Sequence, residues 1–381
     1  MIRAKRMEKN WSQAGAAEGI CAVSYLSKIE QGKAQGSFDV IRSLLDRLEV
    51  SWHDDPGFLK ETDKLFRIWY EKIFAVEPIA LEEVMRGRQE RLNSIYAPDQ
   101  MLVEAWVDKT ECYPLPSALE ICLDERRLAL QRCLQHREEE AVRTYPCALT
   151  ALMAGEALWG LGQRYAKALD LFKEAYRLAC EDGDIRLMLR AKLMIGNWYS
   201  NIHSVPEMEE NYRTAMKIAT ALQEEDICQL IAYNTGATYF EVGRYEDAYD
   251  MLKQSDQEDA MTCQKMALCC EKLGLKEEAL AAVQRARSLP APEGMSDLFE
   301  EMCDLPAYRL THSDYLHDKT YGEKLMHVFR ECRQSCPIGF ATFHLPWVLE
   351  WLTAGRMYKE AYELSIDFPV KCVYEGVKRD I

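Results

Sequence analysis

Four side chains within residues 23–28 have the chemistry to contact the edges of DNA bases. Lys28 can donate hydrogen bonds to guanine O6 and N7, and Val23 can touch the methyl group of thymine. Ser24 and Tyr25 add hydroxyl groups to the same part of a predicted helix. A helix that presents small polar side chains and a lysine from its first turns suits the major groove of DNA.

Two short helices must position these side chains, and the stretch 11–33 predicts both of them with a tight joint between. Ser12 is a good N-cap for the first helix, and Gly19 allows the positive φ of a bend. Ser24 can help to start the second helix, which is predicted to end at Gly32. One apolar face is predicted to pack inward, formed by Ala16, Ala17, Ile20, Leu26 and Ile29.

The charge of the chain is unevenly distributed. The 381 residues carry a net charge of −15, which by itself argues against a nucleic-acid ligand. Residues 1–52 contain eight Lys or Arg against six Asp or Glu, a balance of +2, so the remaining 329 residues carry −17. A mildly basic N-terminal segment on an acidic body fits a DNA-binding domain joined to a sensing or protein-binding domain.

Cysteine usage and hydropathy predict a cytoplasmic protein. The 14 cysteines are scattered through apolar helical runs, so we expect reduced core residues. Neither a signal segment nor an uninterrupted apolar run near 18 residues is found, so we expect no export and no membrane partner.

The body of the chain contains internal repeats. The clearest copies are residues 155–175 and 236–255, and a third begins at Gly196, where His203 replaces the second glycine of the pattern. Weaker copies surround Gly274 and Gly355. The pattern resembles the tetratricopeptide repeat, in which small residues let two antiparallel helices approach closely.

No convincing alternating strand interrupts the helical periodicity. The predicted fold class is therefore all-α, with an N-terminal helix-turn-helix bundle followed by a tetratricopeptide-like helical-repeat solenoid. Between the weaker copies, Pro306 and Pro337 are predicted to mark turns.

The N-terminal segment resembles the Cro/repressor (XRE) type of helix-turn-helix. The stretches that carry the resemblance are Ser12-Gln13, LSKIEQGK at 26–33 and the SFDVIRSLLDRL that follows. The resemblance implies that Ser12, Gln13 and Lys33 contact phosphates and that residues 23, 24, 25 and 28 contact bases. It also implies a buried ion pair between Arg6 and Glu30. The sequence departs from the family at Gly15 and at Ala34-Gln35-Gly36, which replaces the usual turn containing proline.

The first helix of each repeat is expected to line the concave side of the solenoid and to offer a groove to a peptide. An asparagine amide both donates to and accepts from a peptide backbone, so it can hold an extended ligand whatever its side chains. The predicted peptide-binding residues are Arg190, Leu193, Asn197, Ser200, Asn201, Tyr233, Asn234 and Phe240, with Ala237 and Glu241 on the same side. The competing interpretation places the aromatic residues in the core between repeats.

The combination of this head, GICAVSYLSKIE in particular, with a helical-repeat body resembles the RRNPP-type peptide-responsive quorum-sensing transcriptional regulators, the PlcR and NprR kind. The resemblance implies a homodimer on a palindromic double-stranded DNA operator and a short signalling peptide that changes dimer geometry or oligomeric state. The predicted domains are a helix-turn-helix DNA-binding domain at 1–54, a linker helix at 55–75, and a sensor and dimerisation domain at 76–381.

Two other classes of function were weighed against this one. No glycine-rich phosphate loop or Ser/His/Asp arrangement supports an enzyme, and no cofactor is expected. His312, His317, Cys332 and Cys336 lack the paired spacing of metal ligands, so no metal site is expected. A repeat protein that binds and modulates a partner protein, with the head secondary, is the serious alternative.

Overall fold

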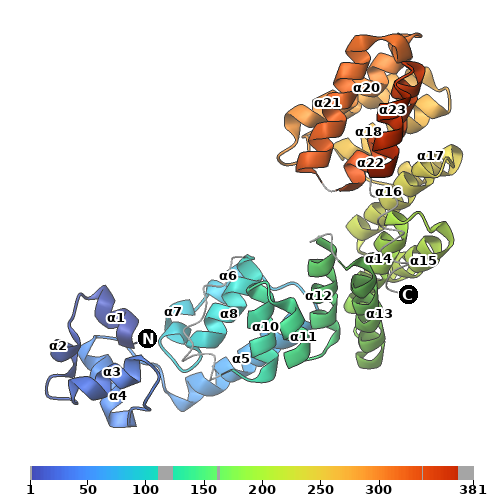
Figure 1. Cartoon of the computed structure of the whole chain (residues 1–381). Coiled ribbons are helices and arrows are strands. Elements are labelled where there is room, and N and C mark those ends of the chain that lie inside the picture. The colour runs from blue at the N-terminus through green and yellow to red at the C-terminus, as the bar shows by residue number, and fades with distance from the viewer. Residues whose placement is uncertain (1, 110–122, 161–163, 337, 368–381) are drawn as a thin grey trace. The chain divides into compact units, whose positions relative to one another are not determined.

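The computed structural model describes residues 2–109, 123–160, 164–336 and 338–367. Within these ranges the regular structure is helical and no strand is present, which confirms the all-α prediction (Figure 1). The chain forms two compact units, Met1–Ala157 with Arg177–Leu187, and Leu158–Tyr176 with Met188–Ile381.

The first unit begins with a four-helix head. Its helices are α1 (Ile2–Glu8), α2 (Gln13–Ala17), α3 (Val23–Glu30) and α4 (Phe38–Arg47). Their apolar residues form one small core, with Ile20 and Ile29 packed at its edge and Ala16, Ala17, Leu26, Leu44, Leu45 and Leu48 at its centre. The face predicted to pack inward therefore does so.

The helix after the head is part of a core and not a free connector. It runs as α5 (Pro56–Phe74), and the Asp55 side chain caps it by accepting from the Phe58 N–H at 3.0 Å. Pro56 suits the first position of a helix, where no N–H is needed. Trp69 is fully buried and packs edge-on against Phe66. The other helices of this unit are α6 (Leu81–Met85), α7 (Arg88–Leu92), α8 (Ala97–Asp108), α10 (Glu125–Leu134) and α11 (Glu138–Thr144).

Helical hairpins build the second unit. The helices α12 (Ala148–Gly160) and α13 (Tyr165–Asp182) each contribute residues to both units. The helices that follow are α14 (Ile185–Asn201), α15 (Val205–Leu222), α16 (Glu225–Glu241), α17 (Tyr245–Leu252), α18 (Ala260–Lys272), α19 (Lys276–Ser288), α20 (Ser296–Thr311), α21 (Lys319–Ser335), α22 (Ile338–Ala354) and α23 (Tyr358–Asp367), with a short 3₁₀ turn, η1 (Tyr315–His317), before α21. From α15 onward each helix packs against the next.

A left-handed residue follows the first helix in four of these hairpins. Gly243 and Gly274 have φ values of 80° and 74°, and His203 and Arg356 have φ values of 55° and 59° at the equivalent places. Glycine adopts this conformation without steric cost, so His203 and Arg356 are the strained members of the four. The second repeat glycine thus marks the turn, as the sequence pattern indicates.

One predicted turn is wrong. Pro306 lies inside α20. Its missing N–H removes a helical hydrogen bond, but the helix continues because buried Met302 and Leu305 before it and buried Arg309 after it hold both sides in place. Pro337 lies outside the described residues.

Candidate functional site

The first short helix of the head begins where the sequence predicts. The Ser12 hydroxyl accepts from the Gly15 N–H at 3.0 Å and so caps α2. Gly19 has φ 70°, which lets the chain turn into α3. A further left-handed residue, Gly32 with φ 69°, follows the end of α3. The two helices are therefore fixed by one cap and two glycine turns.

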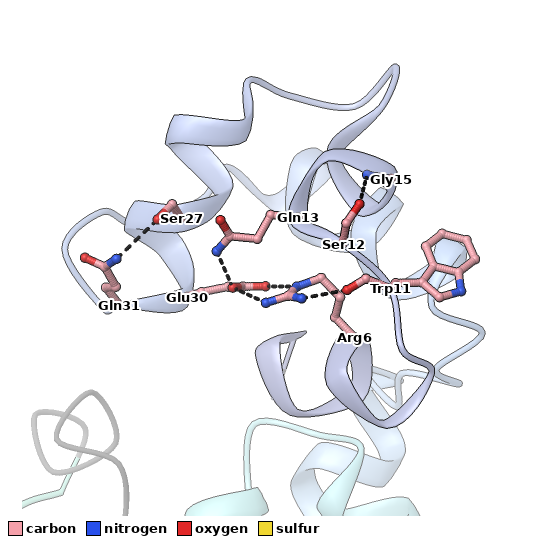
Figure 2. Close-up of polar contacts among 8 residues, drawn as sticks. All are labelled: Arg6, Trp11, Ser12, Gln13, Gly15, Ser27, Glu30 and Gln31. Atoms are coloured by element: carbon pink, nitrogen blue, oxygen red, sulfur yellow. Dashed lines mark hydrogen bonds and ion pairs between the residues drawn. The ribbon is translucent and has the colours of Figure 1, made fainter.

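A buried ion pair joins α1 to α3, as the resemblance implied. Arg6 donates from Nε to Glu30 Oε1 at 2.7 Å and from Nη2 to Oε2 at 2.9 Å (Figure 2). The side chains are 12% and 1% exposed. Arg6 also donates from Nη1 to the Trp11 carbonyl at 2.7 Å. Because the pair is bidentate, it sets the orientation of α3 as well as its distance from α1.

Gln13 joins the same network. Its Nε2 donates to Glu30 Oε2 at 2.7 Å, so the side chain points toward the ion pair (Figure 2). Burial alone would raise the pKa of Glu30, but the hydrogen bonds from Arg6 and Gln13 outweigh it and lower that pKa below its ordinary value. Any contact of the Gln13 side chain with a phosphate would have to share or replace this bond.

The predicted base-contacting side chains lie along α3, from Val23 at its first position to Lys28 in its last turn. Val23, Ser24 and Lys28 are exposed, while Leu26 on the opposite face is completely buried. Tyr25 is half-buried, and its hydroxyl donates to the Gln35 carbonyl at 2.9 Å, which ties α3 to the loop after it. Lys33 is exposed just beyond Gly32. Of the four residues, Tyr25 has an identified role within the head.

In the second unit, α14 and α16 face each other through a polar row. Asn197 Oδ1 accepts from Asn234 Nδ2 at 3.1 Å and from the Tyr212 hydroxyl at 2.6 Å. The Ser200 and Thr238 hydroxyls bond at 2.6 Å. The next pair along the row is His203 with Glu241. The partners are 37 or 38 residues apart, which is two or three residues fewer than the 40 that separate the turn residues His203 and Gly243.

The other predicted peptide-binding residues differ in how accessible they are. Asn201 is exposed, and Arg190 and Tyr233 are half-buried. Leu193 is 9% and Phe240 is 6% exposed. The Phe240 ring lies 5.5 Å from that of Phe343 and 6.1 Å from that of Trp347. Tyr212 and Thr238, which complete the row, were not predicted from the sequence, because the repeat spacing of 40 residues pairs neither of them with its partner.

The residues considered as metal ligands have other contacts. His312 stacks on Tyr308 with ring centres 4.0 Å apart, and His317 bonds Asp314 at 2.6 Å. No group of His, Cys, Asp or Glu suited to a metal ion occurs among the described residues. Within the same part of the chain, no helix is long and apolar enough to cross a lipid bilayer.

The geometry of the head and the family match agree on the class of protein. Residues 2–54 match the family model described as helix-turn-helix, so this segment is a helix-turn-helix domain.

No curated protein sequence matches the chain. Among solved structures, the chain is similar to Bacillus thuringiensis PlcR in complex with the peptide PapR7 and DNA, at 16% sequence identity and a TM-score of 0.32. The match covers 81% of this chain and 96% of that one. A score of this size does not establish a common arrangement of all the helices.

Proposed function

We propose that this protein is a transcriptional regulator that binds operator DNA through α3 and a short signalling peptide through the inner helices of its repeats. As a homodimer it would place two heads on a palindromic operator. The peptide would alter the geometry or oligomeric state of that dimer and so change operator binding. The observation that carries the proposal is the exposed face of α3, which includes Ser24 in its first turn and Lys28 in its last turn, on a helix that the Arg6–Glu30 pair ties to α1.

The DNA-binding part rests on exposure combined with rigidity. A side chain that contacts a base edge must be free of partners inside the protein while its helix is fixed. Lys28 meets the first condition because it is exposed, and the bidentate ion pair of Glu30 on the same helix meets the second. The net charge of +2 on residues 1–52 gives weak attraction to DNA. Two heads acting together would add to it.

We expect Lys28→Ala to weaken binding by about 10- to 100-fold, because one good base contact contributes roughly 1–3 kcal/mol. The measurement is a titration of the full chain with a duplex that the wild-type protein selects from a randomised pool. Lys60→Ala is the matched control, since it removes the same charge from an exposed position on α5. Equal affinities for the wild type and Lys28→Ala would favour the alternative, a module that modulates a partner protein with the head secondary.

The peptide-binding part rests on the polar row between α14 and α16. Asn197 Oδ1 accepts two hydrogen bonds, whereas its Nδ2 contacts the Met194 sulfur at 3.8 Å, a weak acceptor. A peptide carbonyl would be a much better acceptor for this N–H group. The amide is therefore held in place by one end while the other end can still donate to a ligand.

Thermal shift with synthetic peptides, taken from short reading frames beside the gene, tests this part. A ligand present at 100 times its dissociation constant adds about 2.7 kcal/mol of stability. We expect Asn197→Ala to lose this shift. Tyr212→Phe is the matched control, because it removes a hydrogen bond of Asn197 but leaves the amide in place. The proposal fails if no peptide stabilises the wild type, or if Asn197→Ala responds as the wild type does.

A further inference from the structure

A lysine is buried without a hydrogen-bonding partner at the inner side of the repeats. Lys265 on α18 is 6% exposed as a residue, and no side-chain hydrogen bond or ion pair of Lys265 is found among the described residues. Its ammonium is not among the fully enclosed polar atoms that lack a partner, so a small ligand group can still reach it. The ammonium lies instead over the face of the Phe343 ring, 3.0 Å from its centre. Burial lowers the pKa of Lys265 to about 8, so the group is still mainly charged at neutral pH. A buried charge in this state is costly unless a partner of opposite charge reaches it.

The charged groups around Lys265 are already committed to other partners. Glu241 acts on it electrostatically but bonds His203. Glu271 forms a bidentate pair with Arg309. His344 adds no charge, because burial lowers its pKa to about 3. Apart from Glu241, which bonds His203, the cluster of Lys265, Arg309, Glu271 and His344 holds two cations and one carboxylate.

Lys265 occupies, in the next repeat, the position that Asn234 of the proposed peptide site has in its own repeat. It lies nine residues before the left-handed Gly274 of its hairpin. Asn234 lies nine residues before Gly243, and Met194 lies nine residues before His203. The three side chains thus occupy the same position in successive repeats. A ligand that follows the asparagines along the inner helices would arrive at Lys265.

We propose that Lys265 binds a carboxylate of the peptide ligand, which is either its C-terminal group or an acidic side chain. This inference rests on the proposed peptide binding and adds the chemistry of one end of the site. A carboxylate supplies the acceptor and the negative charge that the cluster lacks. The rings of Phe343, Phe240 and Trp347 beside it would pack against an apolar residue next to that carboxylate.

Selection from heptapeptide libraries by the full-length protein tests the proposal. One library has a free C-terminus and no Asp or Glu, a second has an amidated C-terminus with Asp and Glu, and a third has neither carboxylate. We expect binders from the first library if the C-terminal group is bound, or from the second if a side chain is bound. Binders of equal affinity from the third library would overturn the inference.

Substitution of the lysine provides the second measurement. We expect Lys265→Met to lower the affinity for the selected peptide by about tenfold or more, because a charge-assisted hydrogen bond is lost. Lys265→Arg should keep part of that affinity. Lys276→Met is the matched control at the start of α19, where the side chain is exposed. Without peptide, Lys265→Met is expected to melt no lower than the wild type, because it removes an unpaired buried charge. A lower melting temperature together with unchanged peptide affinity would show a structural lysine and contradict the proposal.

The result also separates this inference from the proposed function. Peptides that bind the wild type and Lys265→Met equally would overturn the role of Lys265 and leave peptide sensing intact. Failure to select any peptide from all three libraries would contradict both.

Discussion

At the scale of single residues, the Arg6–Glu30 pair decides how α3, the helix proposed to contact DNA, is held. The two groups are almost completely removed from water, and each satisfies the other through two hydrogen bonds. Such a pair adds little net stability compared with apolar residues of similar size, but loss of one partner leaves a buried charge. The pair therefore acts mainly to fix the position of α3 relative to α1.

We expect Arg6→Met to destabilise the head by about 3 kcal/mol, because Glu30 is left charged and buried. The double variant Arg6→Met/Glu30→Met should recover a large part of this loss. Hydrogen exchange of the α2 and α3 amides in the full chain measures both. Lys5→Met, which breaks a surface pair with Glu8, should cost less than about 1 kcal/mol. A double variant as unstable as Arg6→Met would contradict this account.

The same pair gives the head a defined dependence on pH. The folded-state pKa of Glu30 lies below its ordinary value of 4.5. The stabilisation is therefore fully present above pH 4.5 and is lost as the pH falls through the folded-state pKa. In the hydrogen-exchange measurement, acid should weaken protection of α3 in the wild type, and this part of the effect should be absent from the double variant.

At the scale of elements, two glycines set how closely the repeat helices pack. A Cβ atom on Gly196 would lie 2.3 Å from the Tyr212 ring, and one on Gly236 would lie 2.7 Å from Leu252. Both distances are far shorter than an ordinary contact. The second helix of each hairpin therefore approaches the first along a strip where no side chain is present.

We expect Gly196→Ala and Gly236→Ala to destabilise the second unit by about 1–2 kcal/mol each. Overpacking typically costs 1–3 kcal/mol, which exceeds the gain of up to about 1 kcal/mol in helix propensity. Gly160→Ala is the control, since it is helical and nothing lies within 4 Å of the added Cβ. It should be neutral or stabilising. Guanidinium unfolding followed by circular dichroism checks all three, and equal effects at the three positions would refute the packing argument.

At the scale of the whole chain, the boundary between basic and acidic segments coincides with the proposed boundary between DNA binding and peptide sensing. The segment 1–52 has a net charge of +2 and the rest has −17. An acidic body is repelled by the phosphate backbone, so attraction to DNA is confined to the head. In the proposed regulator, a peptide acts on the acidic repeats and changes how two heads are presented, which requires no direct contact between the peptide and DNA.

Local features of this protein could be predicted from the sequence. The Ser12 cap, the positive φ of Gly19, the turns at Gly243 and Gly274 and the small residues between helices depend on backbone conformation and on neighbours a few residues away. Helical periodicity also identified the inward face of the head correctly. These features could be predicted because the interactions that specify them act within one helix, one turn or one hairpin.

Tertiary structure alone decided which side chains are covered and which partners they meet. Phe240 lies on the predicted inner face, yet Phe343 and Trp347, about a hundred residues later, bury it. Gln13 is turned toward Glu30, and Lys265 lies beneath a ring of α22 without an acceptor. Periodicity tells which face of a helix is apolar, but burial and pairing depend on contacts between segments distant in the sequence. For the stretch 11–33 the sequence determined the helices and their exposed side chains, whereas the buried ion pair that fixes them required Arg6 and Glu30 to meet across the fold.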